Sequence, residues 1–260
     1  TLMQRIDGPV PYYTFDGFEG TTHAVFTRHG GVSPEPFGSL NTGGFIGDSQ
    51  DNVRRNHEIM AEAMRVDPQR MTTTWQVHGN ETVRVLRPSR DRRWLAQADG
   101  MITDRHDVVL TMRFADCTPI LAVDTVRGVI GIAHAGWRGT VRGAASSLIR
   151  AMTHAYGTNP ADVQAGVGPS IGPRRYQVGE EVVRAAHTYF GDIDRLIRRD
   201  PSDGTAYFDL WEANRRDLAN AGVERIEVMG VCTAERTDDF FSHRAEKGMT
   251  GRFGALICLS

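Results

Sequence analysis

The sequence predicts a mixed α/β protein in which layered β-sheets of mixed strand direction are flanked by helices. Three observations predict this class. Short runs rich in β-branched residues are bounded by turn residues, as strands are. Segments with apolar residues at helical spacing lie between some of these runs. Other runs follow one another directly, and a purely parallel barrel does not allow this, so we expect a mixed sheet with helices outside it.

Helices are expected at residues 51–66, 141–156 and 209–222. Asp51 is a suitable N-cap for the first helix. Gly157 follows the second helix and tolerates the left-handed backbone that commonly closes a helix. Asp209 and Glu212 form an acidic variant of a capping box at the start of the third.

Strands are expected at residues 82–86, 108–112, 120–123, 129–133, 163–167, 226–229 and 255–259. The segments 30–48 and 166–175 are rich in glycine and proline but short, which is typical of loops and not of interdomain linkers. No repeat or low-complexity segment interrupts the chain. We therefore expect a single domain over residues 1–260, although this length lies above the usual domain size.

The composition argues against membrane and nucleic-acid partners. No apolar run approaches the roughly 18 to 20 residues that a membrane helix needs. The formal net charge is -2 and the basic residues are scattered, so the one-sided basic patch that binds phosphate backbones is missing. Residues 1–20 do not show the pattern of a secretory signal, so the expected location is cytoplasmic.

Cysteine and histidine residues at the ends of expected strands predict a metal site. Cys117 lies shortly before one strand, His134 directly follows the next, and His78 lies at another edge of the predicted sheet. One thiolate with two imidazoles suits zinc and leaves its fourth position for water or substrate, as in catalytic sites. The spacing matches no local zinc-binding pattern, so a buried apolar cysteine and hydrogen-bonded histidines are the alternative.

Arginine-containing loops are candidate anion or substrate contacts. Arg138 lies in a glycine-containing turn that leads into a helix, where backbone amides and a guanidinium suit a phosphate group; a tight turn with Trp137 in the core is the alternative. Arg28 and Asn41 lie in loops with hydroxyls and glycines that suit a ribose or phosphate, although such loops are more often simply solvated. Arg244 follows two phenylalanines that suit base stacking, or else belong to the core.

Together these segments resemble the YfiH-like family. Its members have been called polyphenol oxidase or laccase domain proteins, peptidoglycan editing factors and purine nucleoside phosphorylases. The resemblance covers nearly the whole chain and implies that His78, Cys117 and His134 are the metal ligands. It rests on residues 26–33, 39–41, 76–79, 98–100, 115–119, 134–139, 166–172, 240–244 and 250–252.

The resemblance implies zinc-dependent phosphorolysis of purine nucleosides, with adenosine deamination and methylthioadenosine phosphorolysis as related activities. A purine nucleoside and phosphate are then the expected partners. Cys117 would act as a metal ligand in the catalytic centre, and Arg28, Arg138 and Arg244 are the candidate anion contacts. Asp116 is a candidate for proton transfer, and a carboxylate that only fixes the turn or the orientation of a ligand is the alternative.

Two other enzyme classes remain open. A Cys117–His134 hydrolase or amidase acting on peptidoglycan precursors needs no metal, but such a pair does not need the second imidazole of His78. A copper-dependent polyphenol oxidase needs many histidines, whereas the nine in this chain are mostly scattered and form no His-x-His pair. Copper could still replace zinc in the same site, because affinity for nitrogen and sulfur ligands favours it. A non-catalytic binding module would require a fully ligated metal.

Overall fold

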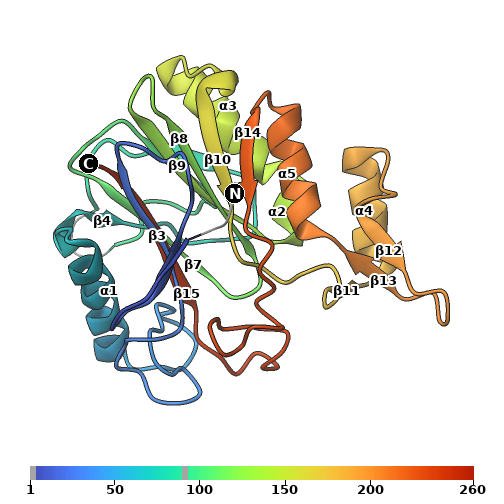
Figure 1. Cartoon of the computed structure of the whole chain (residues 1–260), viewed down its shortest axis with the longest axis horizontal. Helices are drawn as coiled ribbons and strands as arrows, with labels where there is room; N and C mark the ends of the chain where they lie inside the picture. Colours follow the sequence, from blue (N-terminus) through green and yellow to red (C-terminus); the bar gives the residue numbers. More distant parts are fainter. Residues whose placement is uncertain (1–3, 90–92) are drawn as a thin grey trace.

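The computed structural model describes residues 4–89 and 93–260. Within them, two six-stranded sheets pack face to face, and helices cover the outer face of each sheet (Figure 1). Both sheets contain parallel and antiparallel pairs. The predicted class, layered mixed β-sheets flanked by helices, is therefore confirmed.

The first sheet contains the first and last strands of the chain. Its order is β1 (Gln4–Ile6), β2 (Tyr12–Thr14), β3 (Thr21–Phe26), β15 (Phe253–Leu259), β7 (Val109–Phe114) and β4 (Met71–Thr72). β15 is antiparallel to both of its neighbours, and its Gly254 lies opposite Arg113 of β7. Alternate residues of β7 face opposite sides, so Met112 packs against the second sheet while Val109 packs towards α1 (Gln50–Met64).

The second sheet has β8 and β9 at its centre. Its order is β14 (Arg225–Val228), β10 (Val163–Val167), β8 (Thr118–Asp124), β9 (Val129–Ala135), β6 (Gly100–Thr103) and β5 (Thr82–Arg84). β8 and β9 form an antiparallel hairpin in which Pro119 lies opposite His134. Every residue of both strands is buried. The first sheet covers one face and helices cover the other, which explains the continuous apolar character of these runs.

Helices α3 (Ala144–Tyr156) and α5 (Leu210–Asn220) cover the outer face of the second sheet, through residues such as Leu148 and Leu218. The short α2 (Trp137–Thr140) precedes α3, and single 3₁₀ turns lie at Pro68–Arg70 and Pro160–Asp162. Among the described residues, no helix is both long and apolar enough to cross a membrane.

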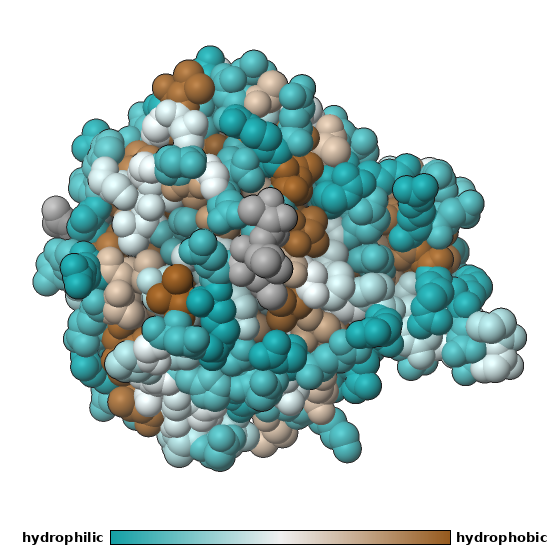
Figure 2. All heavy atoms as spheres, in the orientation of Figure 1, coloured by the Kyte–Doolittle hydropathy of each residue, from teal (hydrophilic) through white to brown (hydrophobic). Residues whose placement is uncertain are grey.

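A smaller unit projects from the body at the right of Figure 1. It contains α4 (Glu180–Phe190) and a three-stranded sheet in the order β11 (Gln177–Val178), β13 (Ala206–Phe208), β12 (Ile197–Arg199). Phe208 of this sheet belongs to the same apolar cluster as Leu210 and Ala213 of α5, which joins the unit to the body. Figure 2 shows that hydrophilic side chains dominate this face of both the body and the projection.

Every predicted strand is present, with each end within two residues of the expected position, and β10 agrees at both ends. The third helix starts as expected, because the Asp209 side chain accepts the Glu212 N–H at 3.0 Å. Gly157 closes α3 with a φ of 69°. The N-cap of α1 is Ser49 and not Asp51, since the Ser49 hydroxyl accepts the Asp51 N–H.

The helix expected over residues 141–156 begins three residues later than expected and is preceded by a separate short helix. α2 ends at Thr140, and α3 begins after Gly143, whose φ is 75°. A Cβ at residue 143 would also overlap the Tyr189 hydroxyl, so the local pattern could not reveal the break. The strands β1 to β4, β6 and those of the projecting unit were not predicted, nor were α2 and α4, because most of these elements are short and are stabilised by neighbours distant in the sequence.

Candidate metal and substrate site

Three candidate metal ligands converge at one end of the β8–β9 hairpin. Cys117 directly precedes β8, and His134 is the penultimate residue of β9, so the hairpin register brings them together. His78 reaches them from the loop between β4 and β5. The ligand atoms of the three side chains all lie within 4.8 Å of one another. The rings of His78 and His134 meet edge to face, with centroids 5.0 Å apart.

Asp99, the residue before β6, orients the ring of His134 and fixes the backbone of His78. Its Oδ1 accepts hydrogen bonds from Nδ1 of His134 at 2.8 Å and from the backbone N–H of His78 at 3.1 Å. Its Oδ2 accepts the backbone N–H groups of Val77 and Gly79. Burial raises the pKa of this carboxyl, but the hydrogen bond and charge of His134 and the two N–H groups outweigh burial and lower it. The arrangement leaves Nε2 of His134 available to a metal.

The backbone around the ligands adopts uncommon conformations. His78 and Asp116 have φ values of 60° and 82°, in the left-handed region that residues other than glycine rarely occupy. Gly136 is required for a steric reason, because a Cβ there would lie 2.9 Å from Sγ of Cys117 and 3.2 Å from Cδ2 of His78. The glycine-containing turn predicted to approach an anion thus makes room for the ligand side chains.

Cys117 and His134 shift each other's pKa in opposite directions. Burial raises the pKa of the Cys117 thiol, but the charge of His134 and hydrogen bonds from both histidines lower it to about 6. Burial lowers the pKa of His134, but the thiolate and Asp99 raise it to about 9. The pair therefore favours a thiolate, which is the form of cysteine that binds metals.

The donor set fits a zinc ion. Tetrahedral zinc with bonds of about 2.0 to 2.3 Å separates its ligand atoms by about 3.5 Å, so donors within 4.8 Å need only small side-chain movements. One thiolate and two imidazoles leave a fourth position open. Within residues 4–89 and 93–260, no other group of three or more histidine, cysteine or acidic residues has ligand spacing.

The three candidate ligands line a cavity of about 470 Å³, which is a usual size for a small-molecule site. Its wall carries three arginines and four aromatic side chains, namely Arg113, Arg244, Arg252, Phe45, Trp75, Trp94 and Tyr176. A second cavity of about 580 Å³ adjoins it and shares Phe45, Trp94 and Arg113 with it.

Comparison with known proteins identifies the family. Residues 22–260 match the family model described as multi-copper polyphenol oxidoreductase laccase. The chain belongs to this laccase-like family. It is 37% identical over 248 residues to the purine nucleoside phosphorylase YlmD of Geobacillus stearothermophilus, covering 92% of this chain and 90% of that protein. It is 33% identical over 244 residues to the purine nucleoside phosphorylase YfiH of Escherichia coli, covering 93% and 95% of the two chains.

A solved structure supports the same assignment. The crystal structure of the hypothetical protein YfiH from Bacillus licheniformis superimposes with a TM-score of 0.93 at 34% identity, covering 99% of each chain. The YfiH-like resemblance inferred from the motifs is therefore confirmed. The two proteins share their fold over 99% of each chain.

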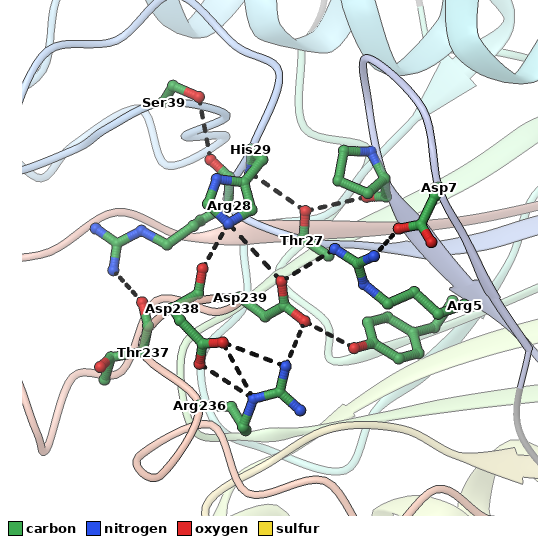
Figure 3. A network of polar contacts seen from close by, with 12 residues as sticks. Arg5, Asp7, Thr27, Arg28, His29, Ser39, Arg236, Thr237, Asp238 and Asp239 are labelled. Carbon is green, nitrogen blue, oxygen red and sulfur yellow. Dashed lines mark hydrogen bonds and ion pairs between the residues drawn. The ribbon is translucent and has the colours of Figure 1, made fainter.

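The structure places Arg28 outside the cavity. Its guanidinium donates to the carbonyls of Gly38 and Thr237 and to Glu246, each at 2.9 Å, and it packs over the ring of Phe241. Figure 3 shows this side chain directed at Thr237 within a polar network. The donors of Arg28 are used to join loops distant in the sequence, and its contact with a substrate stays a prediction.

Asn41 and Arg138 also lie away from the cavity wall. The Asn41 side chain is buried, donates to Asp48 and accepts the backbone N–H of Arg252, so it holds two loops together. Arg138 is exposed and stacks over the ring of Trp137 at 4.4 Å. Direct contact of either side chain with a substrate in this cavity is not supported by these positions.

Asp116 and Arg244 do line the cavity. The Asp116 carboxylate accepts the hydroxyls of Thr233 and Ser242, both at 2.7 Å, and the backbone N–H of Arg244 at 2.6 Å. These contacts favour a positioning role for Asp116, and proton transfer by this residue stays a prediction. The Arg244 guanidinium donates to the carbonyl of Gln177 and lies over the ring of Tyr176.

The functional candidates missed in the sequence had weak local signals. Asp99 lies in a segment that contributed to the family resemblance, but nothing nearby in the sequence indicates its contact with His134. Arg113 is the one charged residue of an otherwise apolar or neutral strand, which is a signal that could have found it. Trp75 and Trp94 lie close to the cavity only because their loops meet there.

Proposed function

We propose that this member of the laccase-like family is a zinc-dependent purine nucleoside phosphorylase. One observation supports this most strongly: the ligand atoms of His78, Cys117 and His134 lie within 4.8 Å of one another at the wall of a cavity that also carries aromatic and cationic side chains. The names of its relatives support the same activity.

Phosphorolysis exchanges one bond at the sugar for another. The bond from C1′ of the ribose to the purine nitrogen breaks with its electron pair leaving on the base, and a phosphate oxygen forms the new bond to C1′. The transition state carries positive charge on the sugar and negative charge on the base, so catalysis requires an ordered anion and a stabilised leaving group. When bound, zinc would supply a Lewis acid and would lower the pKa of a coordinated water.

The residues of the cavity suit the parts of such a substrate. Phe45 is 72% exposed and Trp75 and Trp94 are each 38% exposed, so their faces are accessible. The rings contact one another, with centroid distances of 5.6 Å from Phe45 to Trp75 and 5.3 Å from Phe45 to Trp94. We assign this aromatic wall to the purine, because bases stack on aromatic side chains. Cys117 then serves as a ligand within the catalytic centre.

Two further activities follow from the same proposal. An open zinc position also supports hydrolytic deamination of adenosine, and we propose this as a second reaction. The adjoining 580 Å³ cavity gives room for a larger 5′ substituent, which supports methylthioadenosine as an additional phosphorolysis substrate.

The hydrolase and oxidase alternatives have one supporting observation each. The lowered pKa of Cys117, about 6, suits a metal-free nucleophile, but that role leaves the convergence of His78 unexplained. The family description supports copper, and a copper ion could occupy the same three donors. Oxidation by several copper ions needs further histidine clusters, and the described residues bring together one ligand group.

The test combines metal analysis with product identification. Purified protein is assayed for zinc and copper and is then incubated with inosine or adenosine, with and without phosphate. A phosphorylase gives free base and ribose 1-phosphate only when phosphate is present, and a deaminase gives inosine from adenosine in either buffer. Cys117→Ala should lose metal and both activities. Release of free ribose in phosphate-free buffer would replace the phosphorylase with a hydrolase.

A further inference from the structure

Arg113 and Arg252 lie side by side on the face of the first sheet that α1 covers. Arg113 belongs to β7, and Arg252 directly precedes β15, whose Gly254 lies opposite Arg113. Leu256 has the same strand parity as Arg252 and packs with α1, which fixes the face. Both arginines line the cavity that contains the candidate metal ligands.

The positive charges of this arginine pair have no carboxylate partner. Among the described residues, no acidic side chain forms an ion pair with either guanidinium, whereas Arg28 pairs with Glu246 at 2.9 Å. The recorded acceptors of the pair are backbone carbonyls: Thr74 for Arg113, and Thr250 and Gly251 for Arg252. Each guanidinium carries five N–H donors, so donors remain for a ligand.

Burial without a carboxylate in ion-pair contact is unfavourable for both residues. Burial, followed by the charge of Arg252, lowers the pKa of Arg113 to about 10. Burial also lowers the pKa of Arg252, although the Cys117 thiolate and the Asp116 carboxylate act in the opposite direction. An anion between the two guanidiniums would relieve this cost.

A purely structural role does not explain the Arg113 side chain. The side-chain amide of Gln76 pairs with the backbone of Arg113 through two hydrogen bonds, of 2.8 and 3.0 Å. These bonds already tie the segment that carries His78 to β7. The guanidinium adds one bond, to the carbonyl of Thr74, and its other donors are not needed to hold this loop.

We propose that Arg113 and Arg252 form the subsite for inorganic phosphate, the second substrate of the phosphorolysis assigned above. This inference rests on that proposed function and moves the anion contact from Arg138 and Arg28 to a pair that the sequence pattern did not reveal. Each guanidinium carries a planar fork of N–H donors that suits the oxygens of a phosphate dianion. The metal ligands, the aromatic wall and the arginine pair share one cavity, as a reaction between nucleoside and phosphate requires.

The test measures phosphate binding separately from catalysis. Inorganic phosphate is titrated calorimetrically into the zinc-loaded protein without nucleoside, at constant ionic strength, for wild type, Arg113→Gln, Arg252→Gln and the control Arg138→Gln. Loss of one charged hydrogen-bonding partner should weaken binding by about tenfold to a hundredfold in the first two variants. The control should bind as wild type does. Zinc content and circular dichroism verify that each protein is loaded and folded.

Steady-state kinetics give the second readout. The KM for phosphate should rise by a similar factor in both variants, with a smaller change in the KM for inosine. Lysine at either position should recover part of the affinity, because it keeps the charge without the planar fork. If a glutamine variant does not load zinc, the lysine variant decides by the same KM comparison.

Several outcomes would overturn the subsite. Unchanged phosphate affinity in both glutamine variants would do so, as would a loss confined to Arg138→Gln. Binding of a nucleoside monophosphate without binding of inorganic phosphate would also overturn it. If phosphate binding depends on the two arginines but the protein forms no ribose 1-phosphate, the subsite is supported and the phosphorylase assignment is wrong. If the protein catalyses phosphorolysis but its KM for phosphate does not depend on either arginine, the phosphorylase assignment is supported and the subsite is wrong.

Discussion

Asp99 accepts a hydrogen bond from Nδ1 of His134 at 2.8 Å, and the same carboxylate accepts the backbone N–H of His78 at 3.1 Å. One buried side chain therefore sets the orientation of one candidate ligand and the backbone position of another. The contact explains how the loop that carries His78 and the strand β9 that carries His134 keep their imidazoles together, although they are distant in the sequence.

Replacing Asp99 by asparagine should weaken zinc binding by about tenfold to a hundredfold, the usual effect of losing a partner that orients a metal-bound histidine. Competition with a chromophoric chelator measures the affinity. Asp48→Asn is a matched control, because Asp48 also accepts several hydrogen bonds but lies away from the ligands. It should lower stability and leave zinc affinity unchanged. Equal zinc affinity in Asp99→Asn and wild type would contradict the assigned role.

Replacing Gly136 by alanine should abolish stoichiometric zinc. The added Cβ would lie 2.9 Å from Sγ of Cys117, closer than real contacts of this kind, so the ligand must move. Gly128→Ala is the control: its φ is 65° but its Cβ would meet no atom within 4 Å. It should cost about 1 kcal/mol of stability through backbone strain and retain zinc. Elemental analysis and thermal unfolding of both variants provide the comparison.

Asp116→Asn distinguishes positioning from proton transfer. Asparagine tolerates the left-handed backbone but cannot accept all of the hydrogen bonds from Thr233, Ser242 and the Arg244 N–H, so we expect about 1 to 3 kcal/mol of lost stability. If Asp116 only positions the turn, kcat falls and the shape of the pH–rate profile is preserved. Loss of one limb of that profile would instead show that Asp116 transfers a proton.

His23 should make the fold sensitive to mild acid. Burial lowers its pKa from 6.5 to about 4, and its Nε2 accepts the backbone N–H of Phe15, which only an unprotonated nitrogen can do. The folded pKa is below the unfolded one, so unfolded chains bind the proton first as the pH falls. Protonation of His23 therefore destabilises the fold at low pH. This destabilisation is absent well above pH 6.5, grows between pH 6.5 and 4, and reaches about 3 kcal/mol below pH 4.

Denaturant unfolding at several pH values measures the free energy of unfolding, and comparing wild type with a His23 variant isolates the contribution of His23. His23→Gln retains an acceptor for the Phe15 N–H but does not titrate, so its stability should fall less steeply between pH 6.5 and 4. Replacing the exposed His187 by glutamine should preserve the wild-type slope. Identical slopes for His23→Gln and wild type would show that His23 has the same pKa in the folded protein as in the unfolded chain, which contradicts this prediction.

The sequence by itself determined those features whose causes are local. The capping of α5 by Asp209 and the closure of α3 at Gly157 depend on hydrogen bonds and backbone angles within a few residues, so pattern predicts them. The central strands β8 and β9 were recognisable because all of their residues are buried, and buried strands are apolar. The three candidate ligands were found through segments that resemble a family, since their spacing alone matched no metal motif.

Only the tertiary structure decided which polar side chains share the cavity. Arg28 forms an ion pair with Glu246. Arg113 lies beside Arg252 and has no acidic partner among the described residues. That difference arises from the antiparallel pairing of β7 with β15, which are joined by more than a hundred residues of chain. Strand pairing follows from burial of whole faces, and no local pattern records which distant donor meets which acceptor.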